Sequence, residues 1–167
     1  MLVPHVVAQE SAVQTAPEQA AERCTLAQNY LVNNQKQRDL RARVDRLQAY
    51  RYIYQRMDIF TRRLERNNQP DAINFRSTLN KFQINMDSFK NNYEKYDAAR
   101  EQLVQIKDCR SNTSVFLAQL EDVRAKRLAL SKDIVAIETV LSPTLKSQLE
   151  TLYQTLLSTG KSGARGE

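Results

Sequence analysis

The sequence predicts an all-α fold, a long antiparallel helical hairpin of the coiled-coil kind with a further long helical segment at its C-terminal side. The chain has 167 residues with only 3 glycines and 4 prolines, and 26% of its residues are charged. Few helix breakers and many charges are typical of long helices with one narrow apolar stripe each. Because proline interrupts a helix interior, Pro17, Pro70 and Pro143 mark the boundaries of the predicted helices.

Residues 1–14 form a polar leader without periodicity, and we expect them to be disordered. The segment "VVA" at residues 6–8 has the small and branched residues that precede a signal-peptidase site, although a charged and a long apolar region are missing. The leader is therefore either a signal-peptide remnant or an ordinary terminus. Thr15 and Glu18 form a capping-box pattern, with Pro17 in the first turn, so the first helix is expected to begin there.

The first helix is predicted to end near Arg66. An apolar series runs along it, interrupted by the wholly polar segment "NNQKQRD" at residues 33–39, which predicts a break in the helix. The members of the series are Leu26, Tyr30, Leu40, Val44, Leu47, Tyr50 or Tyr54, Met57 and Leu64.

Residues 67–70, "NNQP", predict the turn of the hairpin, because asparagine tolerates the left-handed geometry that ends a helix and Pro70 can open the next one. The second helix has the most regular pattern in the chain. Its seam positions repeat with alternating spacings of four and three residues, and eight of the nine are apolar or aromatic, which predicts a heptad seam: Phe75, Leu79, Phe82, Met86, Phe89, Tyr93, Tyr96, Arg100 and Leu103.

A C-terminal helical segment is predicted over residues 111–158, with a break or kink at residues 142–143, and residues 159–167 are expected to be a flexible tail. The phase of the apolar pattern slips at "RSNTS", residues 110–114, where the chain either bends or continues. The segment accordingly either overhangs the hairpin or folds back onto it as a bundle, and the sequence leaves both open.

The register of the hairpin is suggested by its two cysteines, Cys24 and Cys109. If they face each other, Tyr93 lies opposite Leu40 and Phe89 opposite Val44, while the polar seam residue Arg100 falls on the polar segment of the first helix. The sequence thus predicts a disulfide that closes residues 15–110 and implies an oxidising compartment. It also predicts a polar core layer, formed by Arg100, Asn33, Asn34 and Gln37.

A second apolar seam follows the cysteine clamp, and the first helix is too short to cover it. We expect this seam and the rest of residues 116–156 to mediate self-association or to bind a partner protein, with Arg127 setting the register. The predicted surface comprises Phe116, Leu120, Val123, Arg127, Leu130, Ile134, Ile137 and Leu141.

The net charge of +6 is concentrated in residues 36–66, which hold ten basic and four acidic residues. Clustered arginines can bind the phosphates of nucleic acid, wall polymers or lipid headgroups, although a solvated helix flank has the same composition. The predicted contacts with a polyanion are Arg38, Arg41, Arg56, Arg62, Arg63 and Arg66.

The sequence predicts no catalytic site, no metal site and no cofactor. Its one histidine, His5, lies in the leader, and the glycines occur only at positions 160, 163 and 166, so no phosphate-binding loop or nucleophile elbow is present. Two thiols do not make a closed zinc site. There is also no apolar run of the length that a transmembrane helix requires.

These observations favour a non-enzymatic, extracytoplasmic or secreted structural and interaction protein, for example a periplasmic or cell-surface spacer, adaptor or assembly subunit. A periplasmic-type hairpin chaperone is one alternative, on the basis of size and charge alone. Binding of anionic polymers by the arginine-rich first helix is the other.

Overall fold

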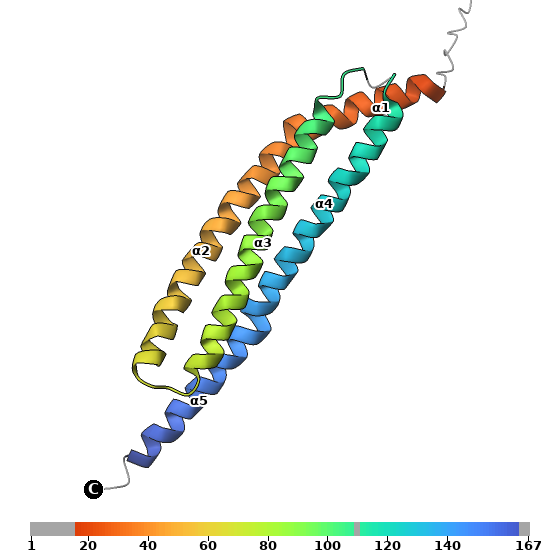
Figure 1. Ribbon diagram of the computed structural model, residues 1–167. Helices are drawn as coiled ribbons and strands as arrows, with labels where there is room; N and C mark the ends of the chain where they lie inside the picture. Colours follow the sequence, from red (N-terminus) through yellow and green to blue (C-terminus); the bar gives the residue numbers. More distant parts are fainter. Residues whose placement is uncertain (1–15, 109–110, 164–167) are drawn as a thin grey trace, which may run out of the picture.

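The computed structural model describes residues 16–108 and 111–163, and these residues are helical almost throughout (Figure 1). The elements are α1 (Ala16–Tyr30), η1 (Leu31–Gln35), α2 (Lys36–Arg66), α3 (Ala72–Val104), α4 (Thr113–Thr139), η2 (Val140–Leu145) and α5 (Lys146–Gly163), where η1 and η2 are π-helical turns. Within the described residues there is no strand, so the predicted all-α class is confirmed. The predicted leader, residues 1–14, lies outside the described part of the chain.

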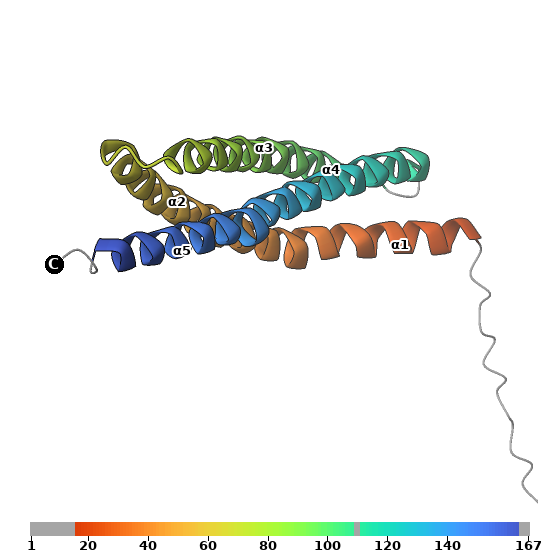
Figure 2. The ribbon, with the colours of Figure 1, turned by 90° about the horizontal axis from the view of Figure 1, so that it is seen from below.

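The helices form three long rods, α1–η1–α2, α3 and α4–η2–α5. Helix α3 packs against both α2 and α4, and α4 returns along α3 instead of overhanging the hairpin. Helices α1 and α5 extend at opposite ends of the molecule (Figures 1 and 2). Of the two arrangements that the sequence leaves open, the structure therefore shows the bundle for α4.

The turn between α2 and α3 is the one predicted from "NNQP". Asn68 has a positive φ of 50°, the N–H of Gln69 bonds the carbonyl of Leu64 at 2.9 Å, and the N–H of Asn68 bonds the carbonyl of Glu65 at 3.0 Å. These two bonds define a Schellman motif, which satisfies carbonyls that the helix end would otherwise leave unpaired. Pro70 does not open α3, because the helix begins two residues later, at Ala72.

The predicted seam of α3 is the centre of the core. Eight of its nine positions are buried, and Met86 is partly buried. Aromatic side chains meet α2 edge to face: Tyr50 packs against Phe82 and Phe89 with ring centroids 6.1 and 6.0 Å apart, and Phe60 packs against Phe75 at 5.2 Å. This geometry is favourable for aromatic pairs beyond the apolar area that they bury.

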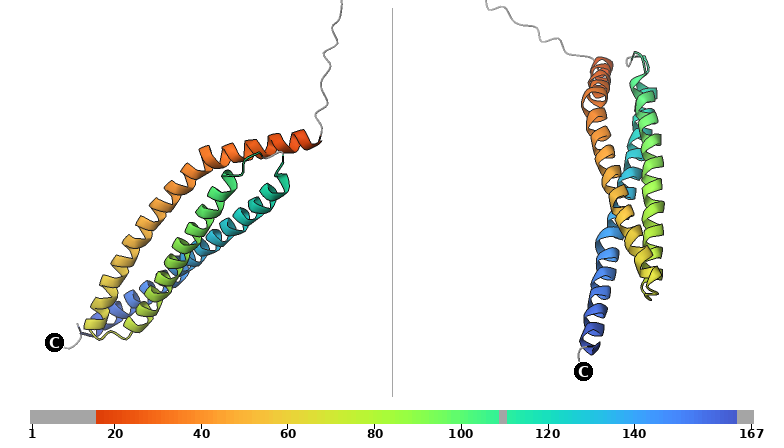
Figure 3. Two further views of the ribbon diagram at one scale, coloured as in Figure 1. Left: turned by 45° about the horizontal axis from the view of Figure 1, so that its top comes forward. Right: turned by 90° about the vertical axis from the view of Figure 1, so that its left-hand side faces the viewer.

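The predicted phase of the first helix is wrong in its N-terminal half. Leu40 and Val44, expected opposite Tyr93 and Phe89, are each 44% exposed. Leu26 and Tyr30 are more exposed still, at 61% and 49%. The cause is η1, whose extra residue per turn rotates the chain so that Leu31 and Gln35 both point into the core. The helix bends at η1 and does not break (Figure 3), as is common at π-helical turns.

The second turn lies between Val104 and Thr113, so the chain bends before α4 and does not continue as one helix through "RSNTS". Asp108 has a positive φ of 53°, and the side-chain amide of Asn112 donates to the carbonyls of Lys107 and Asp108 at 3.1 and 3.3 Å. Short polar side chains that bond nearby backbone are what stabilise such a turn when no glycine is present.

At the predicted break or kink, residues 142–143, the helix does not break, and α4 continues into α5 through the π-helical turn η2. Proline has no N–H, so Pro143 cannot be the α-helical donor to the carbonyl of Thr139, and the i→i+5 pattern of the π-helical turn brings residue 144 to that carbonyl instead. The hydroxyl of Thr144 donates to that carbonyl at 3.3 Å, five residues back along the chain. Pro143 is thus accommodated inside the helix by a π-helical turn.

The predicted association surface on α4 is wrong, because α4 packs this seam against α3. Phe116, Val123, Leu130 and Ile137 are buried, while Leu120, Ile134 and Leu141 pack against the same core. Arg127 is the exposed member of the set.

The prediction of a flexible tail is wrong for residues 159–163, which belong to α5. Helix α5 continues to Gly163, since a glycine lowers helix stability by only about 1 kcal/mol and does not end a helix by itself. Residues 164–167 lie outside the described chain.

Candidate binding site between α2 and α4

A polar network joins α2 to α3 just after the bend at η1. The hydroxyl of Tyr96 donates to Asp39 Oδ2 at 2.5 Å and accepts a hydrogen bond from Gln35 Nε2 at 3.0 Å. Burial, and then the hydrogen bond to the Asp39 carboxylate, raise the pKa of Tyr96 above its ordinary value. Tyr96 therefore stays protonated at neutral pH, where it can donate to Asp39.

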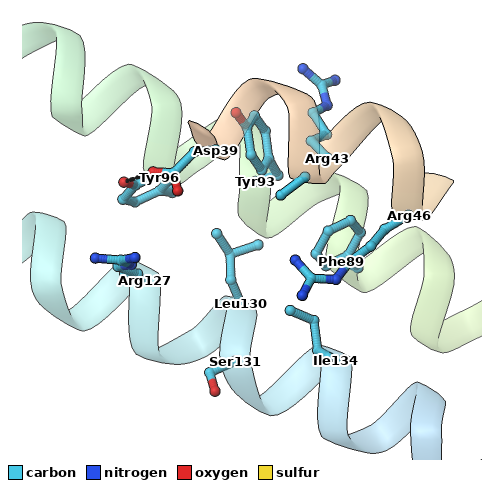
Figure 4. Close-up of a pocket in the computed structure, with 11 residues that line it drawn as sticks. Asp39, Arg43, Arg46, Phe89, Tyr93, Tyr96, Arg127, Leu130, Ser131 and Ile134 are labelled. Atoms are coloured by element: carbon cyan, nitrogen blue, oxygen red, sulfur yellow. Dashed lines mark hydrogen bonds between the residues drawn. The ribbon is translucent and has the colours of Figure 1, made fainter. Parts of the chain in front are cut away.

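A recess of about 180 Å³ opens beside this network, between α2 and α4 (Figure 4). We call it the α2–α4 recess. Helix α2 contributes a polar side, α3 the floor, and α4 a mixed side. Its lining residues are Asp39, Ala42, Arg43, Arg46, Phe89, Tyr93, Tyr96, Arg127, Leu130, Ser131 and Ile134.

The arginines of the recess differ in their contacts. Arg43 lies over the ring of Tyr93, with 4.6 Å between its guanidinium carbon and the ring centroid, and its Nη2 is 4.0 Å from a Glu94 oxygen. In the described part of the chain, Arg46 and Arg127 make no ion pair within 4.0 Å. Both guanidinium groups are drawn beside the apolar side chain of Leu130 in Figure 4.

The predicted polar core layer is only partly correct. Arg100 is buried, at 2% exposure, and pairs with Asp97 on its own helix. Asn33, Asn34 and Gln37 are exposed, so they are not core residues. Because η1 shifts the phase of the helix, Gln35 is the buried amide of this segment, and Tyr96 is its partner.

Of the two cysteines predicted to form a disulfide, the structure describes only Cys24. Cys24 is 3% exposed and belongs to the same core as Leu103 and Phe116. One turn later, Gln28 Nε2 donates to the carbonyl of Ile106 at 2.8 Å, so α1 runs beside the end of α3 in nearly the predicted register. Cys109 lies outside the described residues, and the disulfide stays a prediction.

The arginines predicted to contact a polyanion are all exposed on α2, but three of them have contacts within the chain. Arg62 pairs with Asp58 at 2.8 Å, Arg56 stacks on Tyr52 at 5.1 Å, and Arg66 donates to the carbonyl of Arg62 at 3.3 Å. Arg38, Arg41 and Arg63 have no ion pair among the described residues.

The far end of α5 is a second candidate site. Leu152 is buried against the α2–α3 turn in a cluster with Leu64, Ala72 and Phe75. Beyond Leu152 the helix projects past that turn (Figures 1 and 3). Leu149, Tyr153 and Leu157 are exposed by 44%, 60% and 43%, and their spacing of four residues places them on one face. The side chain of Leu156 lies outside the described set.

In the comparisons with known proteins, no family model matches the chain, and no curated protein or solved structure matches it significantly. Among the described residues, no three metal-ligating side chains gather into a cluster. No helix in the described ranges has the length and hydropathy needed to cross a bilayer.

Two clusters of polar contacts that join the helices to one another were not predicted from the sequence. Asp133 on α4 accepts hydrogen bonds from Ser88 and Asn92 on α3, both at 2.8 Å. Arg76 on α3 holds Glu65 with two bonds, at 2.8 and 2.9 Å, and Asp58 with one at 3.0 Å. Ser88 and Asn92 lie one turn apart on the same helix face, and this spacing of two polar residues is the sequence feature that indicates a polar contact there.

Proposed function

We propose that this protein is a non-enzymatic, extracytoplasmic assembly subunit, in which the bundle is a rigid body and the projecting part of α5 binds a second copy of the chain. The observation that carries this proposal is the exposed apolar face of Leu149, Tyr153 and Leu157 on α5, whose end beyond Leu152 projects past the α2–α3 turn (Figure 1). From Tyr153 to Gly163 this projection measures roughly 16 Å.

The face is self-complementary, which favours a second copy over an unrelated protein. In an antiparallel pair with a two-fold axis at Tyr153, Leu149 of one copy lies opposite Leu157 of the other, because each is four residues from the axis. Such a contact is isologous and closes as a dimer. The charged residues Lys146 and Glu150 fall opposite positions 160 and 156, which are Gly160 and Leu156, so no like charges meet.

A photoreactive benzoylphenylalanine at position 153 tests this arrangement. Irradiation should give a covalent dimer in which residue 153 is joined to residues of α5 in the other copy. The same label at Tyr52, which is 59% exposed on α2, is the matched control and should give no dimer. Labelling of α1 or α2 from position 153, or equal dimer from both positions, would contradict the proposal.

The extracytoplasmic location rests on the predicted Cys24–Cys109 disulfide. Structural disulfides persist in oxidising compartments. Non-reducing peptide mapping of protein purified from such a compartment should find the two cysteines joined, and two free thiols would remove the support for this location.

Binding of a polyanion is a second candidate function, favoured by how the carboxylates of α2 are used. Asp39, Asp58 and Glu65 are held by Tyr96 and Arg76 on α3, and these contacts leave arginines as most of the charged groups on the outer face. Binding of a short duplex DNA or a polyphosphate should then weaken steeply with salt. Arg41→Gln and Arg63→Gln should each reduce that salt dependence, and binding insensitive to salt would contradict this function.

A further inference from the structure

The α2–α4 recess exists because the two helices that flank it pack mainly on α3 and hardly on each other. Helices packed in direct contact fill such a space with interlocking side chains. Here Ala42 stands on the α2 side, and the larger side chains of α2 near it are arginines. The gap is therefore open to solvent and lined on its inner side by the core.

The inner side of the recess is apolar. Phe89 and Tyr93 from α3 and Leu130 and Ile134 from α4 form it, and Phe89, Tyr93 and Leu130 are otherwise buried. A volume of about 180 Å³ is comparable to that of an apolar cavity that accepts a single benzene ring. The space suits one aromatic ring or a short alkyl chain.

The outer side of the recess is cationic. Arg46 and Arg127 line it from opposite helices, and Arg38 lies at its continuation towards Tyr30 and Gln35. Asp39 is the one carboxylate in the lining, and its Oδ2 already accepts the hydrogen bond from Tyr96. Arg46 and Arg127 make no ion pair among the described residues, so against Asp39 they leave the recess lining with net positive charge, to which Arg38 adds at the continuation.

We propose that the α2–α4 recess binds a small organic anion, namely a carboxylate carried on an aromatic ring or a short alkyl chain. The apolar body lies over Phe89 and Leu130, and the carboxylate lies between the guanidinium groups of Arg46 and Arg127. Guanidinium groups match carboxylates in charge and planar geometry, and a charge-assisted hydrogen bond beside an apolar surface is stronger than one in open water. This site is independent of the contact proposed for α5.

Four probe molecules separate the two requirements of the site. Benzoate and hexanoate combine an anion with an apolar body, acetate has only the anion, and benzyl alcohol has only the apolar body. Titration of the full chain, followed by amide chemical shifts and by calorimetry, should show saturable binding of benzoate or hexanoate with Kd of about 1 mM or tighter. Acetate and benzyl alcohol should bind at least about tenfold more weakly, and the shifts should centre on residues of α2 and α4 around the recess.

Variants then test the named residues. Arg46 and Arg127 are exposed, so Arg46→Gln and Arg127→Gln should leave the fold intact, as a melting curve can verify. Each should weaken binding of the anion by about tenfold, the factor expected when one charge-assisted contact is lost. Arg63→Gln removes the same charge from α2 away from the recess and should leave the affinity unchanged.

Three results would overturn this proposal. They are the absence of saturable binding by both benzoate and hexanoate, equal affinity for benzyl alcohol, and an equal loss of affinity in Arg63→Gln. The last would mean that the net charge of the helix attracts the anion without a defined site. Because none of these measurements involves α5, each outcome is separate from that of the proposed assembly.

Discussion

Tyr96 on α3 and Asp39 on α2 are joined by a hydrogen bond of 2.5 Å, and the same tyrosine hydroxyl accepts a bond from the buried amide of Gln35. Tyr96→Phe removes both bonds while it keeps the packing of the ring. Because Gln35 is then left with a buried, unpaired donor, the free energy of unfolding should fall by about 1–3 kcal/mol. Denaturant unfolding measures this loss. Tyr52→Phe, on an exposed side chain of α2, should change stability little, and equal effects of the two substitutions would contradict the role of the network.

Arg100 is a buried cation whose removal should not destabilise the protein. Its Nη1 has no hydrogen-bond partner, and its ion-pair partner Asp97 is 34% exposed and can be hydrated in its absence. Replacement of a buried charge by an apolar side chain of similar volume is often neutral or stabilising. Arg100→Leu should therefore leave the melting temperature unchanged or raise it. A large drop would show that Arg100 is stabilised by more than Asp97.

The π-helical turn at Pro143 predicts a coupling between two substitutions. Thr144→Val removes the hydroxyl that bonds the Thr139 carbonyl and should cost about 0.5–1 kcal/mol. In Pro143→Ala, a backbone N–H is restored at position 143, so the same Thr144→Val change should cost close to nothing. A double-mutant cycle from unfolding curves measures the difference. Equal costs in both backgrounds would show that the hydroxyl does not replace the missing donor.

Glu65 should make stability depend on pH in the acidic range. The hydrogen bonds from Arg76 hold the pKa of Glu65 below its ordinary value. A carboxylate with a lowered folded-state pKa stabilises the fold fully above the unfolded pKa of about 4.3, and this contribution is lost as pH falls through the folded pKa. The melting temperatures of the wild type and Glu65→Gln should therefore differ at pH 7 and converge in acid. Glu138→Gln, on an exposed residue without an ion pair in the described chain, is the control, and a pH-independent difference for Glu65→Gln would contradict the interpretation.

The central helix was the part of the fold most accessible from sequence. Helix α3 packs against both neighbouring rods. Its seam residues therefore contact both rods, and its heptad pattern is nearly uninterrupted from Phe75 to Leu103. The turn at Asn68 could be predicted for a different reason, because few residues other than glycine and asparagine readily adopt its positive φ.

The remaining features depend on geometry that periodicity does not encode. The π-helical turn at Leu31–Gln35 adds one residue to the repeat, and this changes which side chains of α1 and α2 face the core. The turn before α4 contains neither glycine nor proline and depends on the backbone conformation of Asp108. The α2–α4 recess results from the spacing of two helices that meet a third, which no single stretch of sequence specifies.

Sedimentation velocity of the full chain over a range of concentrations tests the central claim, that the projecting end of α5 is the assembly surface. Three half-exposed apolar side chains per copy predict a weak, reversible dimer, with Kd on the order of 1 µM to 1 mM. The wild type should pass from monomer to dimer across this range, and the double variant Tyr153→Ser and Leu157→Ser should remain monomeric while its bundle melts at an unchanged temperature. The matched control, Tyr52→Ser and Ile84→Ser, removes two exposed apolar side chains elsewhere and should dimerise as the wild type does. A wild-type protein that remains monomeric throughout, or a dimer that persists in the α5 variant, would contradict the account.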